Sequence, residues 1–163
     1  FGGPVVINSK LRDGSLRDAA RKRGVKVLLY EGGQSLRFEE PVVRAGLKGC
    51  QRLMQEIGMI KGKKLLKKEV TFLAKWSYWL RAPHSGSFRT YRKLGDYVEE
   101  GQLLAVITDT FGQEPYKVTA GVSGVIIGLS LLPLVNQGDA MVHIAVSEEK
   151  ASRGGDRLID GDI

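Results

Sequence analysis

Glu31 is the residue of this sequence best placed for acid–base chemistry. It follows the apolar run Val-Lys-Val-Leu-Leu-Tyr of residues 25–30 and precedes Gly32 and Gly33. A short apolar run without alternation is typical of a strand buried on both faces, as in a parallel sheet. Ligands of open α/β sheets bind just beyond the carboxyl ends of such strands. The sequence therefore predicts Glu31 at a strand end where its carboxylate can reach a ligand.

The residues before Glu31 predict a βαβ unit. Residues 4–8 read as a short strand, and Ser15 with Asp18 three residues later has the form of a capping box. The helix that follows ends before Gly24, which suits a left-handed residue after a helix. With residues 25–30 as the second strand, the two strands are expected to be parallel, with a right-handed crossover.

A second helix is expected after Glu31. Glu39 and Glu40 place acidic groups at its positive end, Pro41 suits its first turn, and Gly58 ends it. Its apolar residues recur at helical spacing and predict one packed stripe, made of Val43, Leu47, Cys50, Met54 and Ile57. On that stripe Cys50 is interpreted as a packed thiol and not as a nucleophile.

Composition limits the function classes. The 163 residues are 42% hydrophobic and 26% charged, as in ordinary globular proteins. No apolar run approaches the about 20 residues of a membrane span, and no secretory signal is visible. The single cysteine, Cys50, excludes an internal disulfide and favours a reducing, cytoplasmic location. The chain opens on Phe1 without an initiator methionine, so we expect a fragment of a longer protein.

The net charge of +7 is concentrated in the first part of the chain. Residues 1–69 contain sixteen Lys and Arg against seven Asp and Glu. This excess suits an anionic ligand such as a carboxylate substrate, or it is a solvated lysine-rich surface. The basic run at 61–69 is short and has no nucleic-acid motif beside it, so no nucleic-acid partner is expected. No membrane partner is expected either, and a homo-oligomer stays open.

Residues 82–146 contain an internal repeat. Ala-Pro-His-Ser-Gly at 82–86 corresponds to Ala-Gly-Val-Ser-Gly at 120–124, and Val-x-x-Gly at 98–101 corresponds to Val-x-x-Gly at 135–138. Each half predicts strand, turn and strand, and two such halves form a small barrel or sandwich with approximate two-fold symmetry. The expected organisation is an α/β part at 1–60, a basic linker at 61–69, an all-β domain at 70–146 and a polar tail at 147–163.

The repeat resembles the biotinyl/lipoyl-type hybrid barrel. In that family the hairpin between the halves carries a lysine that holds the cofactor. The hairpin here, residues 108–116, has no lysine, and Lys117 lies past the turn. Covalent cofactor carriage is therefore not expected.

The whole chain resembles the C-terminal half of the succinylglutamate desuccinylase/aspartoacylase family of zinc-dependent deacylases, which are related to zinc carboxypeptidases. The stretches that carry the resemblance include residues 8–17, the Leu-Leu-Tyr-Glu-Gly-Gly of 28–33, the Leu-Arg-Phe of 36–38 and residues 81–86. The resemblance implies the C-terminal part of a carboxypeptidase-like α/β domain followed by a hybrid barrel. It implies zinc as cofactor and the amide of an N-acyl amino acid as substrate.

The resemblance implies that Glu31 is the general acid/base. Amide hydrolysis needs an activated water, and a nearby carboxylate can take its proton and return it to the leaving amine. An arginine fork matches the carboxylate of such a substrate. Arg12, which follows the first strand, is the stronger candidate; Arg17 and Arg21 share a helix face and are either further binding residues or solvated.

The metal site departs from the family pattern. The family binds zinc through a His-x-x-Glu pair and a later histidine, all before the position of Glu31. Here the only histidines are His84 and His143, neither at ligand spacing. They are interpreted as packed or surface residues, and the zinc ligands are expected before Phe1. The alternative function is a non-catalytic binding or scaffold module built on a hybrid barrel.

Overall fold

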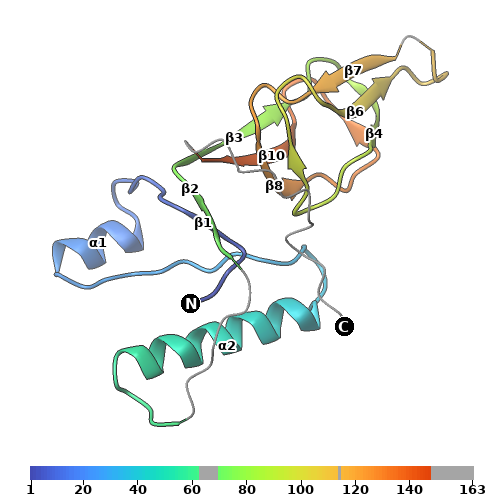
Figure 1. The fold of residues 1–163 in the computed structure, drawn as a ribbon. Helices are drawn as coiled ribbons and strands as arrows, with labels where there is room; N and C mark the ends of the chain where they lie inside the picture. The colour runs from blue at the N-terminus through green and yellow to red at the C-terminus, as the bar shows by residue number, and fades with distance from the viewer. Residues whose placement is uncertain (63–69, 114, 148–163) are drawn as a thin grey trace. The chain divides into compact units, whose positions relative to one another are not determined.

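The chain divides into two compact units in the computed structural model, which describes residues 1–62, 70–113 and 115–147 (Figure 1). The described residues of the first unit are 1–4, 9–62 and 70–71, and those of the second are 5–8 and 72–147 without 114. Most of the predicted basic linker and all but the first residue of the predicted polar tail lie outside the described residues.

The first helix, α1 (Leu16–Lys22), begins and ends as predicted. The Ser15 hydroxyl accepts a hydrogen bond from the amide of Asp18 at 3.2 Å, and Gly24 follows the helix with a φ of 72°. This left-handed conformation is open to glycine without strain. Only half of the capping box forms, because the Ser15 amide donates to the carbonyl of Arg12.

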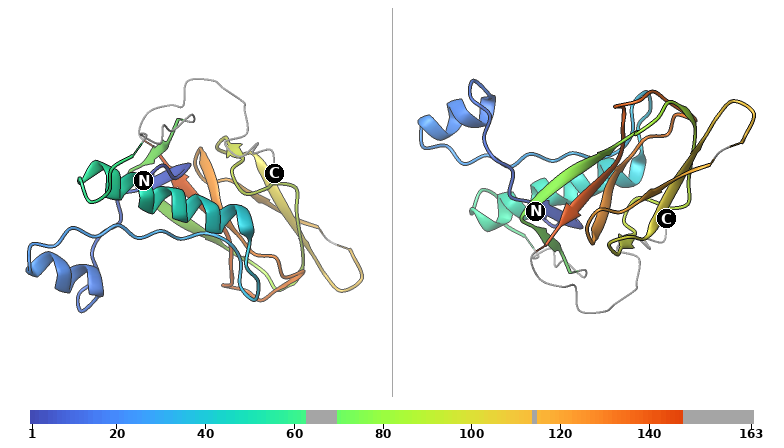
Figure 2. Two further views of the ribbon diagram at one scale, coloured as in Figure 1. Left: turned by 90° about the horizontal axis from the view of Figure 1, so that it is seen from below. Right: turned by 90° about the horizontal axis from the view of Figure 1, so that it is seen from above.

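Residues 25–30 run from α1 towards α2 as an open trace in Figures 1 and 2, and they form no strand. The predicted βαβ unit is therefore wrong for this chain. Strand β1 (Val5–Ile7) pairs in parallel with β2 (Phe72–Ala74) instead. A central strand is held by hydrogen bonds to strands on both sides, and within the described residues 25–30 have no such neighbour. Their side chains are accordingly exposed, by 66% at Leu28.

The second helix, α2 (Glu40–Glu56), has Pro41 in its first turn and ends before Gly58, as predicted. Four of the five residues of its predicted apolar stripe are exposed. Leu47 and Ile57 are 59% and 60% exposed, and the thiol of Cys50 is exposed, so its interpretation as a packed group was wrong. Of the stripe only Met54 is half-buried, and the rings that pack on α2 lie against Gly46 and Gly49 beside the stripe.

The second unit contains β1, β2 and two four-stranded antiparallel sheets. One sheet has the order β3-β10-β8-β5 and the other β7-β6-β4-β9. The strands of these sheets are β3 (Trp76–Arg81), β4 (Gly86–Thr90), β5 (Tyr97–Val98), β6 (Leu103–Thr108), β7 (Tyr116–Thr119), β8 (Gly124–Leu129), β9 (Leu134–Val135) and β10 (Ala140–Val146).

The strand pairing confirms the internal repeat. Strand β4 pairs with β6 and β9, and β8 pairs with β10 and β5 in the same relation. Within these pairs Gly86 lies opposite Val135, and Gly124 lies opposite Val98. Each sheet therefore contains strands of both halves, so neither half can form its sheet alone.

One hydrophobic core among the described residues combines side chains from both of these sheets. Its largest fully buried side chains come from both halves and include Leu104, Ile107, Ile126, Met141 and Ile144. The pairings close neither sheet on the other, so of the expected barrel or sandwich the chain forms a sandwich of two open sheets, and the hybrid barrel is not confirmed. The chain is thus a mixed α/β protein in which strands predominate.

Candidate functional site

Glu31 lies in the turn that joins the extended residues 25–30 to α2. Its side chain is exposed, and it has no hydrogen-bond or ion-pair partner within the described residues. The prediction that Glu31 lies at a strand end was wrong, because residues 25–30 form no strand. The carboxylate is therefore open to a ligand, and the neighbouring residues determine its position.

Tyr30 attaches this turn to α2. Its hydroxyl donates a hydrogen bond of 2.9 Å to the main-chain oxygen of Val42, and its ring lies against Gly46. The ring of Phe1 packs against the Tyr30 ring, with 5.1 Å between the two ring centroids. Desolvation of the phenol by partial burial raises the pKa of Tyr30 above its ordinary value of 10.0.

A second set of contacts holds the other side of Glu31. Gly33 has a φ of 82°, and a Cβ at this position would lie 3.2 Å from the Oε2 of Glu39. The other oxygen of Glu39 accepts a hydrogen bond of 2.9 Å from the side-chain amide of Gln34. Glu39 is the N-cap residue of α2, so the turn is joined to the start of the helix on both sides of Glu31.

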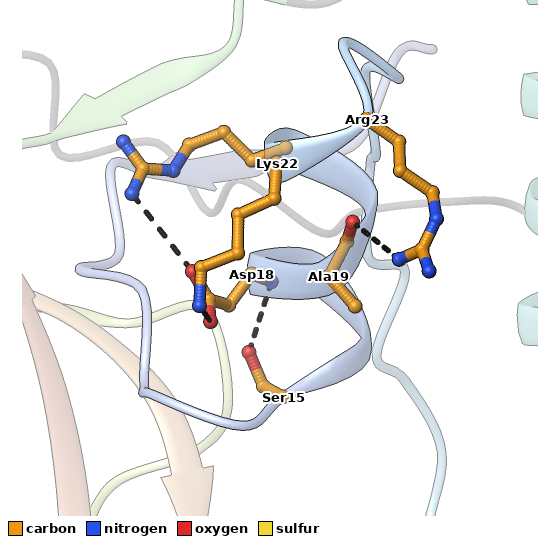
Figure 3. Close-up of polar contacts among 6 residues, drawn as sticks. Ser15, Asp18, Ala19, Lys22 and Arg23 are labelled. Atoms are coloured by element: carbon orange, nitrogen blue, oxygen red, sulfur yellow. Dashed lines mark hydrogen bonds and ion pairs between the residues drawn. The ribbon is translucent and has the colours of Figure 1, made fainter.

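Asp18 forms ion pairs with two cations of α1, Arg21 and Lys22 (Figure 3). Its carboxylate side chain is only 4% exposed and forms ion pairs with Lys22 at 2.8 Å and with Arg21 at 3.8 Å. Arg21, one of the predicted substrate-binding residues, therefore already has a carboxylate partner. The sequence analysis missed this role of Asp18, although its spacing of three and four residues from these cations on a helix was a usable signal.

The side chains of Arg12 and Arg17 have no partner within the described residues. Arg12 is exposed in the loop before α1, and Arg17 is half-buried in its first turn. No hydrogen bond or ion pair joins Glu31 to Arg12, Arg17 or Arg21. The described residues thus do not bring the predicted carboxylate and arginines together.

The loop after Glu31 carries two fully exposed apolar side chains. Leu36 and Phe38 are 103% and 97% exposed, and Leu36 has a φ of 67°, which a leucine adopts only with strain. The sequence analysis noted their Leu-Arg-Phe motif but gave it no role. Single exposed apolar side chains are ordinary at a protein surface, so these two residues are given no role in the site.

The described residues do not fit a catalytic zinc site. Within residues 1–62, 70–113 and 115–147 no three His, Cys, Asp or Glu side chains form a group that could hold a metal ion. His143 is stacked on Trp79 at a centroid distance of 4.4 Å, and His84 contacts the Tyr116 ring edge-on at 4.8 Å. Both histidines thus take part in aromatic packing in the second unit.

Two further features bear on the kind of site. A hollow of about 800 Å³ lies beside Phe1, Arg52 and Ile60, and neither Glu31 nor any of the candidate arginines lines it. The candidate site therefore remains the exposed turn around Glu31.

No helix in the described part of the chain combines the length and apolar character needed to cross a bilayer.

The chain is similar in structure to several solved proteins. The product-bound ectoine utilization protein EutE (DoeB) from Ruegeria pomeroyi aligns with 90% of this chain, at 22% identity and a TM-score of 0.77. A succinylglutamate desuccinylase from Silicibacter sp. TM1040 aligns with 87%, at 22% identity and 0.74. A succinylglutamate desuccinylase/aspartoacylase from Rhodobacter sphaeroides aligns with 91%, at 18% identity and 0.74.

These likenesses concern the fold. The chain has the fold of a portion of succinylglutamate desuccinylase/aspartoacylase structures, which confirms at this level the resemblance found in the sequence. It covers 47%, 44% and 47% of those three structures, so it spans about half their length. No protein-family model and no curated protein matches the chain.

Proposed function

We propose that the chain is part of a zinc-dependent hydrolase that cleaves the amide bond of N-acyl amino acids or similar small molecules. The observation that carries the proposal is the exposed carboxylate of Glu31, held in a turn on α2 within a chain of this fold. Structures of the same fold bear the names of enzymes that act on acylated amino acids.

Glu31 suits proton transfer because its carboxylate has no competing partner within the described residues. In amide hydrolysis it takes a proton from the attacking water and delivers it to the nitrogen of the departing amine. A positioned acid/base of this kind contributes about 10²–10⁴-fold in rate. Gly32 and Gly33 let this turn lie close to α2, because a Cβ at Gly32 would lie 2.9 Å from Cγ1 of Val42 and one at Gly33 would lie 3.2 Å from Oε2 of Glu39.

The arginine assignment follows the ion pairs of α1. Arg21 is occupied by Asp18, whereas Arg12 and Arg17 have free guanidinium groups among the described residues. A guanidinium can bind the carboxylate of an N-acyl amino acid through two parallel hydrogen bonds. We therefore assign substrate binding first to Arg12 and then to Arg17, with Arg21 as the weakest candidate.

Zinc would be held by residues other than those described here, since these contain no suitable group of ligands. The unburied apolar surface of the first unit supports a missing portion of the domain. Residues 25–30 and the stripe of α2 expose the kind of apolar side chains that an α/β domain buries. The solved structures contain about twice the length of this chain.

The alternative is a non-catalytic binding or scaffold module. It is favoured by the second unit, which has a hydrophobic core of its own among the described residues. In this alternative Glu31 has no chemical role, and the two-sheet unit is the functional part.

The test uses the full-length gene product, purified with zinc, and two probes, N-succinyl-L-glutamate and N-acetyl-L-aspartate. Glu31→Gln should lower kcat by about 10²–10⁴-fold while zinc content and the thermal unfolding midpoint stay unchanged. Glu40→Gln is the matched control, because Glu40 is an exposed carboxylate that pairs with Arg44. Turnover retained by Glu31→Gln contradicts the role of Glu31, and a full-length protein without zinc or turnover supports the scaffold alternative.

A further inference from the structure

We propose that Tyr30 is a positioning residue, which holds the Glu31 carboxylate in place through the contact of its ring with Gly46 of α2. The inference rests on the proposed role of Glu31 in proton transfer. It adds a residue pair that the sequence analysis did not identify. Neither residue touches the substrate in this proposal; both act through the position of Glu31.

The contact between the Tyr30 ring and α2 is possible only because position 46 is glycine. A Cβ at this position would lie 2.9 Å from Cε1 of the ring and 3.4 Å from Cδ1. Real Cβ atoms essentially never come this close, so a larger residue would displace the ring. The hydrogen bond of the Tyr30 hydroxyl to Val42 fixes the far end of the ring as well.

The contact with the Tyr30 ring explains why α2 contains a glycine at position 46, although glycine destabilises a helix. A glycine in a helix interior destabilises it by about 0.5–1 kcal/mol relative to alanine. Helix α2 contains Gly46 and Gly49 three residues apart, on the same face. Gly46 receives the ring of Tyr30 and Gly49 that of Phe1. The two glycines thus provide a flat surface on which the rings can lie.

Contacts on both sides of Glu31 restrict its backbone. Before it, Tyr30 is held on Val42 and Gly46; after it, a Cβ at Gly32 would lie 2.9 Å from Cγ1 of Val42. Glu31 itself makes no side-chain hydrogen bond within the described residues, so its position depends on these neighbours. A displacement of about 1 Å at a catalytic group can cost about 10²-fold in rate.

The experiment is a double-mutant cycle in the full-length protein with N-succinyl-L-glutamate and N-acetyl-L-aspartate as probes. Gly46→Ala should lower kcat by about 10–100-fold with KM unchanged, because the substrate-binding arginines are not touched. In the Tyr30→Ala background the same substitution should have no further effect, because the ring it displaces is absent. Tyr30→Phe keeps the ring and should retain most of the activity.

Gln51→Ala is the control for helix propensity. Gln51 is exposed on α2 and has no hydrogen-bond partner within the described residues, so this substitution favours the helix without adding a group against the Tyr30 or Phe1 ring. It should leave kcat unchanged. A role in stability alone would change the unfolding midpoint of Gly46→Ala and leave kcat of the folded protein unchanged, and that result overturns the proposal. Equal effects of Gly46→Ala in both backgrounds overturn it as well.

Nuclear Overhauser effects separate this inference from the proposed function. If the protein hydrolyses neither probe, or if Glu31→Gln keeps its activity, the proposed function fails. The contact is still tested in the wild type, where the ring protons of Tyr30 should show Overhauser effects to the Hα protons of Gly46. Gly46→Ala should weaken the effects between the Tyr30 ring and Val42 and Gln51→Ala should not; absence of the wild-type effects refutes the contact.

Discussion

Gly86 and Gly124 occupy equivalent positions in the two halves of the second unit. A Cβ on Gly86 would collide with the main-chain oxygen of Thr108, and one on Gly124 would collide with that of Ala145. Each glycine is the first residue of a strand that pairs with the neighbouring strand of its own half. The repeat in the sequence is therefore a repeat of the same steric requirement.

Gly86→Ala and Gly124→Ala should each lower the free energy of unfolding by about 1–3 kcal/mol, because the obstacle is main chain and cannot rotate away. Urea unfolding followed by tryptophan fluorescence measures this loss. Gly121→Ala is the control, since its Cβ would meet only the Tyr78 hydroxyl at 3.7 Å, an ordinary contact. A loss at Gly121 as large as at Gly86 would contradict the steric explanation.

The turns of the second unit explain why its internal repeat could be predicted from the sequence. Gly101 and Gly138 have φ values of 77° and 90°, and their amides donate to the carbonyls of Ala120 and Ala82. The hydroxyls of Ser123 and Ser85 accept hydrogen bonds from the turns beside these glycines. These requirements are local and repeat along the sequence, so the correspondence of the halves was visible without a structure.

The first unit was less predictable because its strand signal depends on partners. The apolar run at 25–30 has the composition of a buried strand, but strand formation needs hydrogen-bonded neighbours that the described residues do not supply. The ends of α1 and α2 were predicted from Ser15, Gly24 and Pro41, whose effects are local. Which face of α2 packs was not, since Gly46 carries no apolar side chain to indicate it.

Asp18→Asn should loosen α1. The substitution removes the charge that a nearly buried carboxylate offers to Lys22 and Arg21, and we expect a local loss of about 1 kcal/mol. Amide hydrogen exchange across α1 should accelerate accordingly. Glu40→Gln breaks a pair of which both members are at least 66% exposed, and its effect should be smaller. Equal effects of the two substitutions would show that burial of Asp18 does not matter.

The ionisation of Tyr30 should weaken its attachment to α2. Because burial raises the pKa of this phenol in the folded chain, the contribution of Tyr30 to stability is complete below pH 10. It is lost as the pH rises through the higher pKa of the folded state. The tyrosinate absorbance of Tyr30 is the wild-type absorbance minus that of Tyr30→Phe. Titrated with pH, it should have a midpoint above the pKa of free tyrosine. A midpoint at or below the free value contradicts the burial.

Cys50 reports whether the apolar stripe of α2 is covered. In the chain of residues 1–163 the thiol is exposed, so it should react with a chromogenic disulfide reagent at nearly its rate in urea. Cys50→Ser should change the free energy of unfolding by no more than about 0.5 kcal/mol, as at other surface positions. Slow reaction of the native chain would contradict the exposure.

The same thiol tests the proposal that further structure completes the first unit. In the full-length gene product the reaction should slow strongly, because side chains that cover Leu47 and Ile57 on the same stripe would also cover Cys50. Residues 25–30 should gain protection from amide exchange in that protein, since a strand with hydrogen-bonded neighbours exchanges slowly. Equal thiol reactivity in both proteins would leave the stripe exposed and would favour the scaffold alternative, in which the first unit has no catalytic domain to complete.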